Sequence, residues 1–202
     1  MNPLIHIRSR AAHFPETNID TDIIFPARYL LRTEREGLGE CAFRDRRFTE
    51  DGTEIADFPM NRDGWRDAQV IVGGPGFGCG SSREHAVWAL VDYGIRVVIA
   101  PDFGDIFAGN ALKNGLLVRK LPKDVCDMLG EKAEAGAIFE VDIAAQTLTV
   151  DGKKICDLGL THDVQQAFLN GWDETDTILN RDGDFIDAFE ARHRQAQPWL
   201  FA

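Results

Sequence analysis

The 202-residue sequence is poor in cysteine, and its four cysteines lie far apart without a C-x-x-C pair: Cys41, Cys79, Cys126 and Cys156. This spacing excludes a disulfide framework and a zinc knuckle, and it predicts free thiols in a reducing compartment. An iron–sulfur cluster usually takes clustered thiolates. We therefore expect this chain to hold no metal or cofactor of its own.

Long apolar runs and an excess of positive charge are also absent. No run approaches the ~18 residues of a membrane span, and the N-terminus lacks an apolar signal core before a small-residue cleavage site. We therefore expect a cytoplasmic protein. With 22 basic and 33 acidic residues, the net charge is 22 − 33 = −11. This charge opposes binding to nucleic acid or anionic membranes, so an anionic substrate would need a local concentration of positive charge.

The chain has an ordinary globular composition, with 44% apolar and 27% charged residues. A chain of this length can form one buried core, so we expect a single domain over residues 1–202. Strands and helices alternate from Val70 to Leu121, and Asp151-Gly152 predicts a hairpin, which together indicate the α/β class. A helix starting at Thr161 and a helical pattern over 184–194 predict a C-terminal helical segment over about 161–202.

Two parts of the sequence are less regular. Residues 4–13 favour one strand, followed by a turn-rich stretch. Residues 41–68 show no clear period and are expected to form a long excursion from the core.

The strongest local signal is the run Gly73-Gly74-Pro75-Gly76-Phe77-Gly78-Cys79-Gly80-Ser81-Ser82-Arg83-Glu84-His85, placed between an apolar strand and a helix expected over 81–93. Glycines allow a ligand to approach the backbone, and the first amides of a helix attract an anion. Arg83 adds a bidentate donor for a carboxylate or phosphate. The run therefore predicts an anion-binding site.

Other interpretations fit parts of this run. Ser81 and Glu84 have the S-x-x-E spacing of a capping box, and His85 is expected to be structural because it is poorly placed for a Ser-His pair. A dinucleotide-binding turn would place Asp102 near a ribose, although the glycines run G-x-G-x-G and not G-x-G-x-x-G. A P-loop fits less well, since a serine stands where its lysine should be.

From Gly78 to His85, and through Asp92-Tyr93-Gly94 and Phe103-Gly104-Asp105, the sequence resembles the swivelling domain of the aconitase superfamily. Asn18-Ile19-Asp20-Thr21-Asp22, together with Asn170-Gly171-Trp172-Asp173, resembles the small-subunit family of the 3-isopropylmalate dehydratases. The resemblance covers nearly the whole chain. It implies a single swivelling β/β/α domain.

The resemblance also implies a heterodimer in which a [4Fe-4S] cluster, acting as a Lewis acid, is bound by the large subunit. The implied reaction is the leucine-pathway isomerisation of 2-isopropylmalate to 3-isopropylmalate, by dehydration and rehydration. This chain would be active only with that large subunit. A related 2-alkylmalate, citramalate or homoaconitate hydro-lyase, an NAD-dependent oxidoreductase and a noncatalytic binding relative remain alternatives.

Site residues carry over from the family by position. Ser81 matches the serine base, and Ser82 and Arg83 match positions that bind substrate carboxylate and stabilise the alkoxide. Thr21 and Asp22 match a T-D motif near the site. An Asx turn or helix cap is the alternative role for Asp22. Three arginines are candidates for a further substrate contact: Arg28, Arg32 and Arg35. Of these we favour Arg32.

The sequence departs from the family pattern at two places. Gly73-Gly74-Pro75-Gly76 stands where relatives often carry larger polar residues, and Gly104 stands where alanine is common. Both lie close to the expected pocket. Tyr29-Leu30-Leu31-Arg32 stands where the family recognises the side chain of the substrate, and its two apolar leucines suit an isopropyl group.

Overall fold

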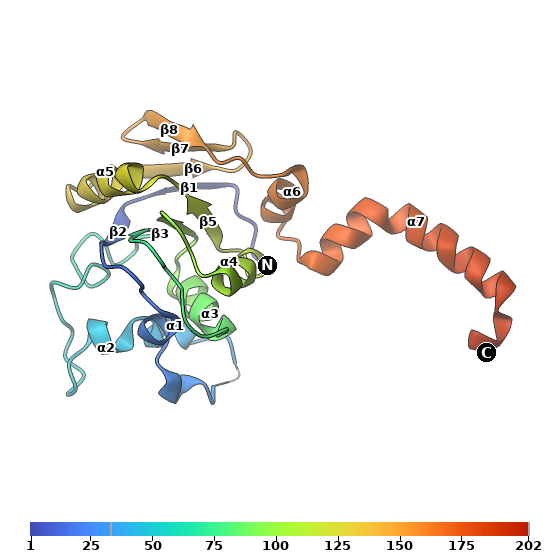
Figure 1. Ribbon diagram of the computed structural model, residues 1–202, viewed down its shortest axis with the longest axis horizontal. Coiled ribbons are helices and arrows are strands. Elements are labelled where there is room, and N and C mark those ends of the chain that lie inside the picture. Colours follow the sequence, from blue (N-terminus) through green and yellow to red (C-terminus); the bar gives the residue numbers. More distant parts are fainter. Residues whose placement is uncertain (33, 202) are drawn as a thin grey trace.

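The computed structural model describes residues 1–32 and 34–201, and its strands form two four-stranded sheets (Figure 1). The antiparallel sheet has the order β1 (His6–Ser9), β6 (Phe139–Asp142), β7 (Thr147–Val150), β8 (Lys153–Asp157). The parallel sheet has the order β2 (Ala11–Phe14), β3 (Val70–Gly73), β4 (Val97–Ala100), β5 (Leu117–Lys120). The prediction of one strand over residues 4–13 is wrong, because the chain passes from one sheet to the other at Arg10.

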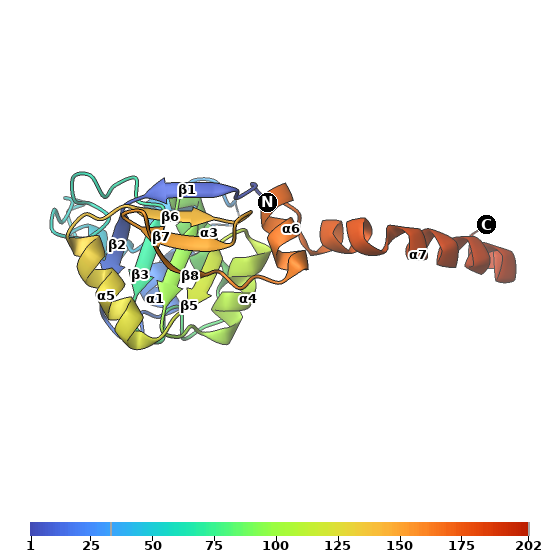
Figure 2. The same cartoon turned by 90° about the horizontal axis from the view of Figure 1, so that it is seen from above.

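The helices connect the strands and extend the chain at its C-terminal end (Figure 2). They are α1 (Thr21–Ile24), η1 (Ala27–Tyr29), η2 (Leu38–Cys41), α2 (Arg44–Arg47), α3 (Glu84–Tyr93), α4 (Asp105–Lys113), α5 (Lys123–Glu134), α6 (His162–Asn170), α7 (Glu174–Ala196) and η3 (Pro198–Leu200). In the described ranges, none combines the length and apolar character that crossing a bilayer requires.

The predicted helix at the end of the chain exists, but it is longer than residues 184–194. Helix α7 begins ten residues earlier because Asp173 forms a capping box with Asp176: each carboxylate accepts the other residue's backbone N–H, at 2.8 and 3.2 Å. Thr161 caps α6 as expected, accepting the amide of Val164 at 3.4 Å.

The parallel sheet is covered on both faces, which is why β3 and β4 are entirely buried. One face packs with α5 and the antiparallel sheet in a single apolar cluster, to which Val70, Val97, Leu129, Phe139 and Val141 belong. The other face is covered by α1, α3 and the segment 38–60. The layers are therefore sheet, sheet and helix, and the predicted β/β/α arrangement is confirmed.

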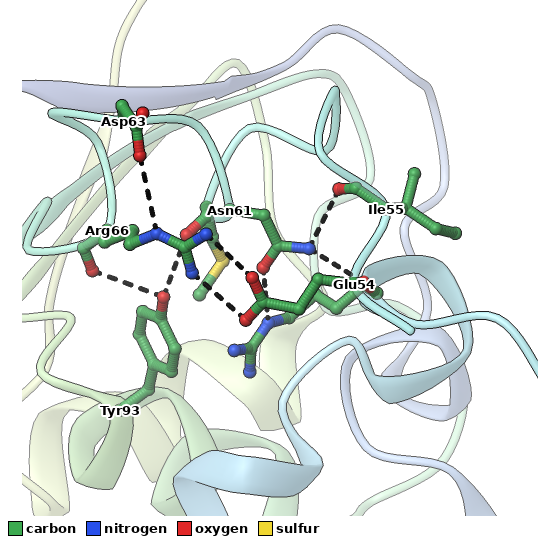
Figure 3. A network of polar contacts seen from close by, with 8 residues as sticks. Glu54, Ile55, Asn61, Asp63, Arg66 and Tyr93 are labelled. Atoms are coloured by element: carbon green, nitrogen blue, oxygen red, sulfur yellow. Dashed lines mark hydrogen bonds and ion pairs between the residues drawn. The ribbon is translucent and has the colours of Figure 1, made fainter. Parts of the chain in front are cut away.

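The segment 41–68 is not the excursion from the core that its missing periodicity predicts. Phe43 is fully buried and stacks on Phe14, with ring centroids 4.8 Å apart. Polar contacts hold the rest against α3 (Figure 3). The hydroxyl of Tyr93 donates to the backbone carbonyls of Met60 and Arg66 at 3.0 and 3.2 Å. Contacts with other parts of the fold hold residues 41–68 in place more than regular secondary structure does. Sequence periodicity does not encode such contacts.

Candidate active site

The candidate site lies where three neighbouring parallel strands end. Parallel strands place their carboxyl ends at one edge of a sheet, so the segments after β2, β3 and β4 meet there. Single bridges join these segments, between Asp20 and Cys79 and between Phe77 and Phe103. The glycine-rich run is thus held between two other loops, and the two sequence motifs come together at this edge.

Glycine is required in this loop by close packing. Gly78 has a φ of +70°, and a Cβ there would lie 2.2 Å from the ring of Phe107 on α4. A Cβ on Gly104 would lie 2.4 Å from the carbonyl oxygen of Gly78. The departure from alanine at Gly104 therefore fits the close approach of two loops.

Thr21 fixes the backbone of Ser81, 60 residues further along the chain. Its buried Oγ1 donates to the Ser81 carbonyl and accepts the Ser81 amide, both at 3.1 Å. Asp20 caps α1 by accepting the amide of Ile23 at 2.8 Å and so sets the position of Thr21. Sequence reasoning missed this role of Asp20, which a capping residue directly before the apolar Ile23 and Ile24 could have indicated.

The predicted capping box of Ser81 and Glu84 does not form. Helix α3 begins only at Glu84, and its capping residue is Arg83. The carboxylate of Glu84 instead accepts the side-chain amide of Asn114 at 2.7 Å. Ser81 and Ser82 remain exposed at the entrance to the helix. Ser81 is consequently held through its backbone.

Arg83 and Asp22 form an ion pair that joins the two motifs, with Nη1 of Arg83 donating to the carboxylate. Asp22 is not the helix cap that its residue type allowed, because Asp20 takes that position. The Arg83 side chain is largely buried, while that of Asp22 is half exposed. Since a guanidinium has five N–H donors, Arg83 keeps N–H donors that the ion pair with Asp22 does not use.

The three candidate arginines lie in different surroundings. Arg28 makes a bidentate ion pair with Asp45, which raises the pKa of Arg28 and lowers the pKa of Asp45. Arg35 lies over the ring of Trp88, 4.5 Å from its centroid. Arg32 lies 5.5 Å from the centroid of the Tyr29 ring, and within the described residues its side chain has no ion-pair partner. The contacts do not bring Arg32 to Ser81 or Arg83.

Two other residues of the motif have local partners. Asp102 accepts the amide of Gly76, so this carboxylate stabilises the loop and is not directed at a ribose. His85 packs between aromatic rings, 4.7 Å from the centroid of Trp88 and 5.6 Å from that of Phe25. Across residues 1–32 and 34–201, no three His, Cys, Asp or Glu side chains are grouped as metal ligands.

Fold and site together define a domain of the aconitase type. Residues 1–124 match the family model of the aconitase C-terminal domain. Residues 181–202 match the family model for the C-terminal domain of the 3-isopropylmalate dehydratase small subunit.

Individual relatives cover nearly the whole chain. It is 46% identical to the 3-isopropylmalate dehydratase small subunit of Rhodospirillum centenum over 90% of both chains. It is 41% identical to that of Ruegeria pomeroyi over 99% of this chain and 100% of the relative. A 3-isopropylmalate dehydratase crystal structure from Methanocaldococcus jannaschii matches with a TM-score of 0.64 and 28% identity, over 92% of this chain and 99% of the other. The chain belongs to the family of 3-isopropylmalate dehydratase small subunits.

Proposed function

We propose that this chain, assembled with a large subunit, isomerises 2-isopropylmalate to 3-isopropylmalate by removing and re-adding water. The observation that supports the proposal is the pair of hydrogen bonds by which Thr21 fixes the backbone of the exposed Ser81, two residues before Arg83, in a chain of the 3-isopropylmalate dehydratase small-subunit family. The described residues of this chain do not offer a ligand set for an iron–sulfur cluster. We therefore assign the [4Fe-4S] cluster to the large subunit.

In this proposal Ser81 is the base. As an oxyanion, its Oγ takes the proton from the carbon next to the one that bears the hydroxyl, while the C–O bond breaks and hydroxide leaves to give an alkene. The large subunit's cluster would supply the Lewis acid for that hydroxide, and the proton and the hydroxide together make up the water that is removed. Returning the proton and the hydroxide to the alkene in the opposite sense, each to the other carbon, gives the isomer. The position at the entrance to α3 favours a serine oxyanion, because unpaired helix amides and Arg83 are close.

The neighbouring residues bind and position. Arg83, with Ser82, holds a substrate carboxylate, and Asp22 orients the Arg83 guanidinium. Thr21 positions Ser81, because the Thr21 hydroxyl is already used in the two hydrogen bonds to the Ser81 backbone. Arg32 is the proposed additional contact, next to the exposed Leu31, whose apolar side chain suits an isopropyl group. A cytoplasmic location remains a prediction.

The test is the Ser81→Ala variant assembled with the large subunit. We expect turnover to fall roughly 10²- to 10⁴-fold, because a base that acts in the transition state contributes about that much. Thermal stability should change little, since the Ser81 hydroxyl caps no helix. Ser82→Ala and Arg83→Lys should mainly raise KM. Near-normal turnover of Ser81→Ala would contradict the base assignment, and a panel of 2-alkylmalates, citramalate and homoaconitate would test the substrate.

A further inference from the structure

Helix α7 extends away from both sheets and buries none of its residues (Figure 1). At 3.6 residues per turn, Ile178, Phe185 and Phe189 fall within about 40° of one another, with Leu179 and Ile186 on one flank. We call these five residues the apolar strip. Three of its side chains are strongly exposed: Phe185 is 77%, Phe189 57% and Leu179 53% accessible. A row of this kind marks an interaction surface.

The last residues described, 193–201, continue the apolar strip, and we call them the chain end. The ring of His193 lies 5.3 Å from that of Phe189 and 5.4 Å from that of Phe201, by centroids. Trp199 and Leu200 in η3 are also exposed. Because a buried aromatic side chain contributes roughly 150–250 Å², the strip and chain end together offer on the order of 750 Å². This area approaches the ~800 Å² that each partner contributes to a stable interface.

A hollow of about 500 Å³ lies where α7 leaves the body. Its lining includes Leu112, Val164, Trp172 and Ile178, so the hollow continues the apolar strip. Two ion pairs join the first turns of α7 to the body, Lys113 with Glu174 at 3.4 Å and Arg181 with Asp163 at 2.8 Å. These contacts attach the first turns of α7 to α4 and α6, and the hollow beside them can receive an apolar anchor from a partner.

Charge argues against a second copy of this chain as that partner. In a parallel pair of α7 helices, Asp182 in the middle of the strip would face its own copy, and each chain carries a net charge of −11. From Glu174 to Asp187 the helix has five acidic residues and one arginine. An apolar groove with basic residues along its rim complements this surface.

We propose that α7 and η3 dock into such a groove on the large subunit, with the apolar strip as the main contact. That the partner is the large subunit rests on the proposed function. Helix α7 runs away from the body, and its C-terminal end lies at the far end of the molecule from α1 and α3 (Figures 1 and 2). A large subunit that binds α7 must therefore extend back along the body to reach the candidate active site.

The test compares two double variants of the full chain. Phe185→Glu with Phe189→Glu places two charges in the apolar strip, and Asn180→Glu with Ala191→Glu places the same charges on the opposite face. Binding of each to the large subunit is measured by calorimetry, with circular dichroism as a check on helicity. We expect the strip variant to raise Kd at least roughly 100-fold, as for loss of a buried aromatic anchor, and the control to bind like the unaltered chain.

Two outcomes would overturn the proposal. One is unchanged affinity of the strip variant, or equal loss in the control. The other is sedimentation showing that the unaltered chain dimerises through the strip while large-subunit binding is unaffected. The test is separate from that of the proposed function: saturating large subunit should restore turnover to the strip variant but not to Ser81→Ala. If Ser81 is not the base, the affinities remain decisive.

Discussion

The glycine-rich loop of residues 74–83 and helix α7 are held in place by different means. The loop gains contacts from neighbouring segments: Gly78 donates to Ile19 at 2.7 Å, and Gly74 donates to Phe14 at 2.8 Å. Helix α7 satisfies its backbone internally and starts with its own capping box, yet it buries no residue. The loop depends on the fold around it, whereas α7 depends mainly on local hydrogen bonds.

A subunit that works in an assembly needs a formed site and a surface that binds its partner, and the two regions differ in which of these they provide. The geometry around Ser81 is already fixed within this chain, because the contacts with Thr21 are internal. The free energy that holds α7 against another surface is not supplied by this chain, since its apolar strip has no cover in the described ranges. Perturbing each region should therefore affect different measurements.

The largest effect on stability is expected from Gly78→Ala. The new Cβ would meet the ring of buried Phe107 at 2.2 Å, and the φ of +70° strains any L side chain. Overpacking and backbone strain together should lower the free energy of unfolding by about 2–4 kcal/mol. Urea denaturation measures this loss.

Gly152→Ala is the matched control for this prediction. Gly152 has a similar φ of +74° in a hairpin turn, but nothing lies within 4 Å of an added Cβ. Only the strain remains, and the cost should be about 1 kcal/mol. Equal losses in the two variants would show that the packing of the loop on α4 contributes little.

An intermediate effect is expected from the interior thiol of Cys126 on α5. Burial raises the pKa of Cys126 from 9.0 to about 11 in the folded chain. The thiol therefore stays protonated in the folded state while the unfolded chain loses the proton, so its contribution to stability is complete below pH 9 and is lost as pH rises towards 11. A rise of about two pKa units corresponds to an expected loss of roughly 2–3 kcal/mol.

Cys126→Ala isolates this contribution, because other titrating groups act equally in both proteins. The difference in unfolding free energy between the two chains should shrink between pH 8.5 and pH 11. A difference that stays constant over this range would mean that the thiol of Cys126 is accessible to water in the folded protein.

Sequence reasoning reached the layers of the fold and the place of the site, because the apolar strands and the glycine run are local signals. It misplaced the start of α3, since the S-x-x-E spacing of Ser81 and Glu84 indicates a cap at Ser81, whereas the helix begins at Glu84 and the Glu84 carboxylate accepts the side-chain amide of Asn114. It also missed how Thr21 holds Ser81, because a hydrogen bond across 60 residues leaves no pattern in the chain. Long-range contacts decided both points.

The smallest effect on global stability is expected from Asp173→Ala, which removes the capping box of α7. Loss of a helix cap costs about 1 kcal/mol, but here the cost falls on a helix that buries nothing in the body. Amide exchange in the first turns of α7 should accelerate about fivefold, while the melting temperature stays within about 1 °C of the unaltered chain, because local opening is separate from global unfolding.

Thr161→Ala provides the comparison, since Thr161 caps α6, a helix that buries Phe168 in the core. A cap loss of similar size, about 1 kcal/mol, should there shift the melting temperature by roughly 2–4 °C, as expected for a chain of about 200 residues. Asp173→Ala and Thr161→Ala each remove a helix cap, 12 positions apart. Amide exchange would detect the first loss, and the melting temperature would detect the second. If Asp173→Ala lowers the melting temperature as much as Thr161→Ala, then α7 unfolds together with the body and does not rely on its own cap.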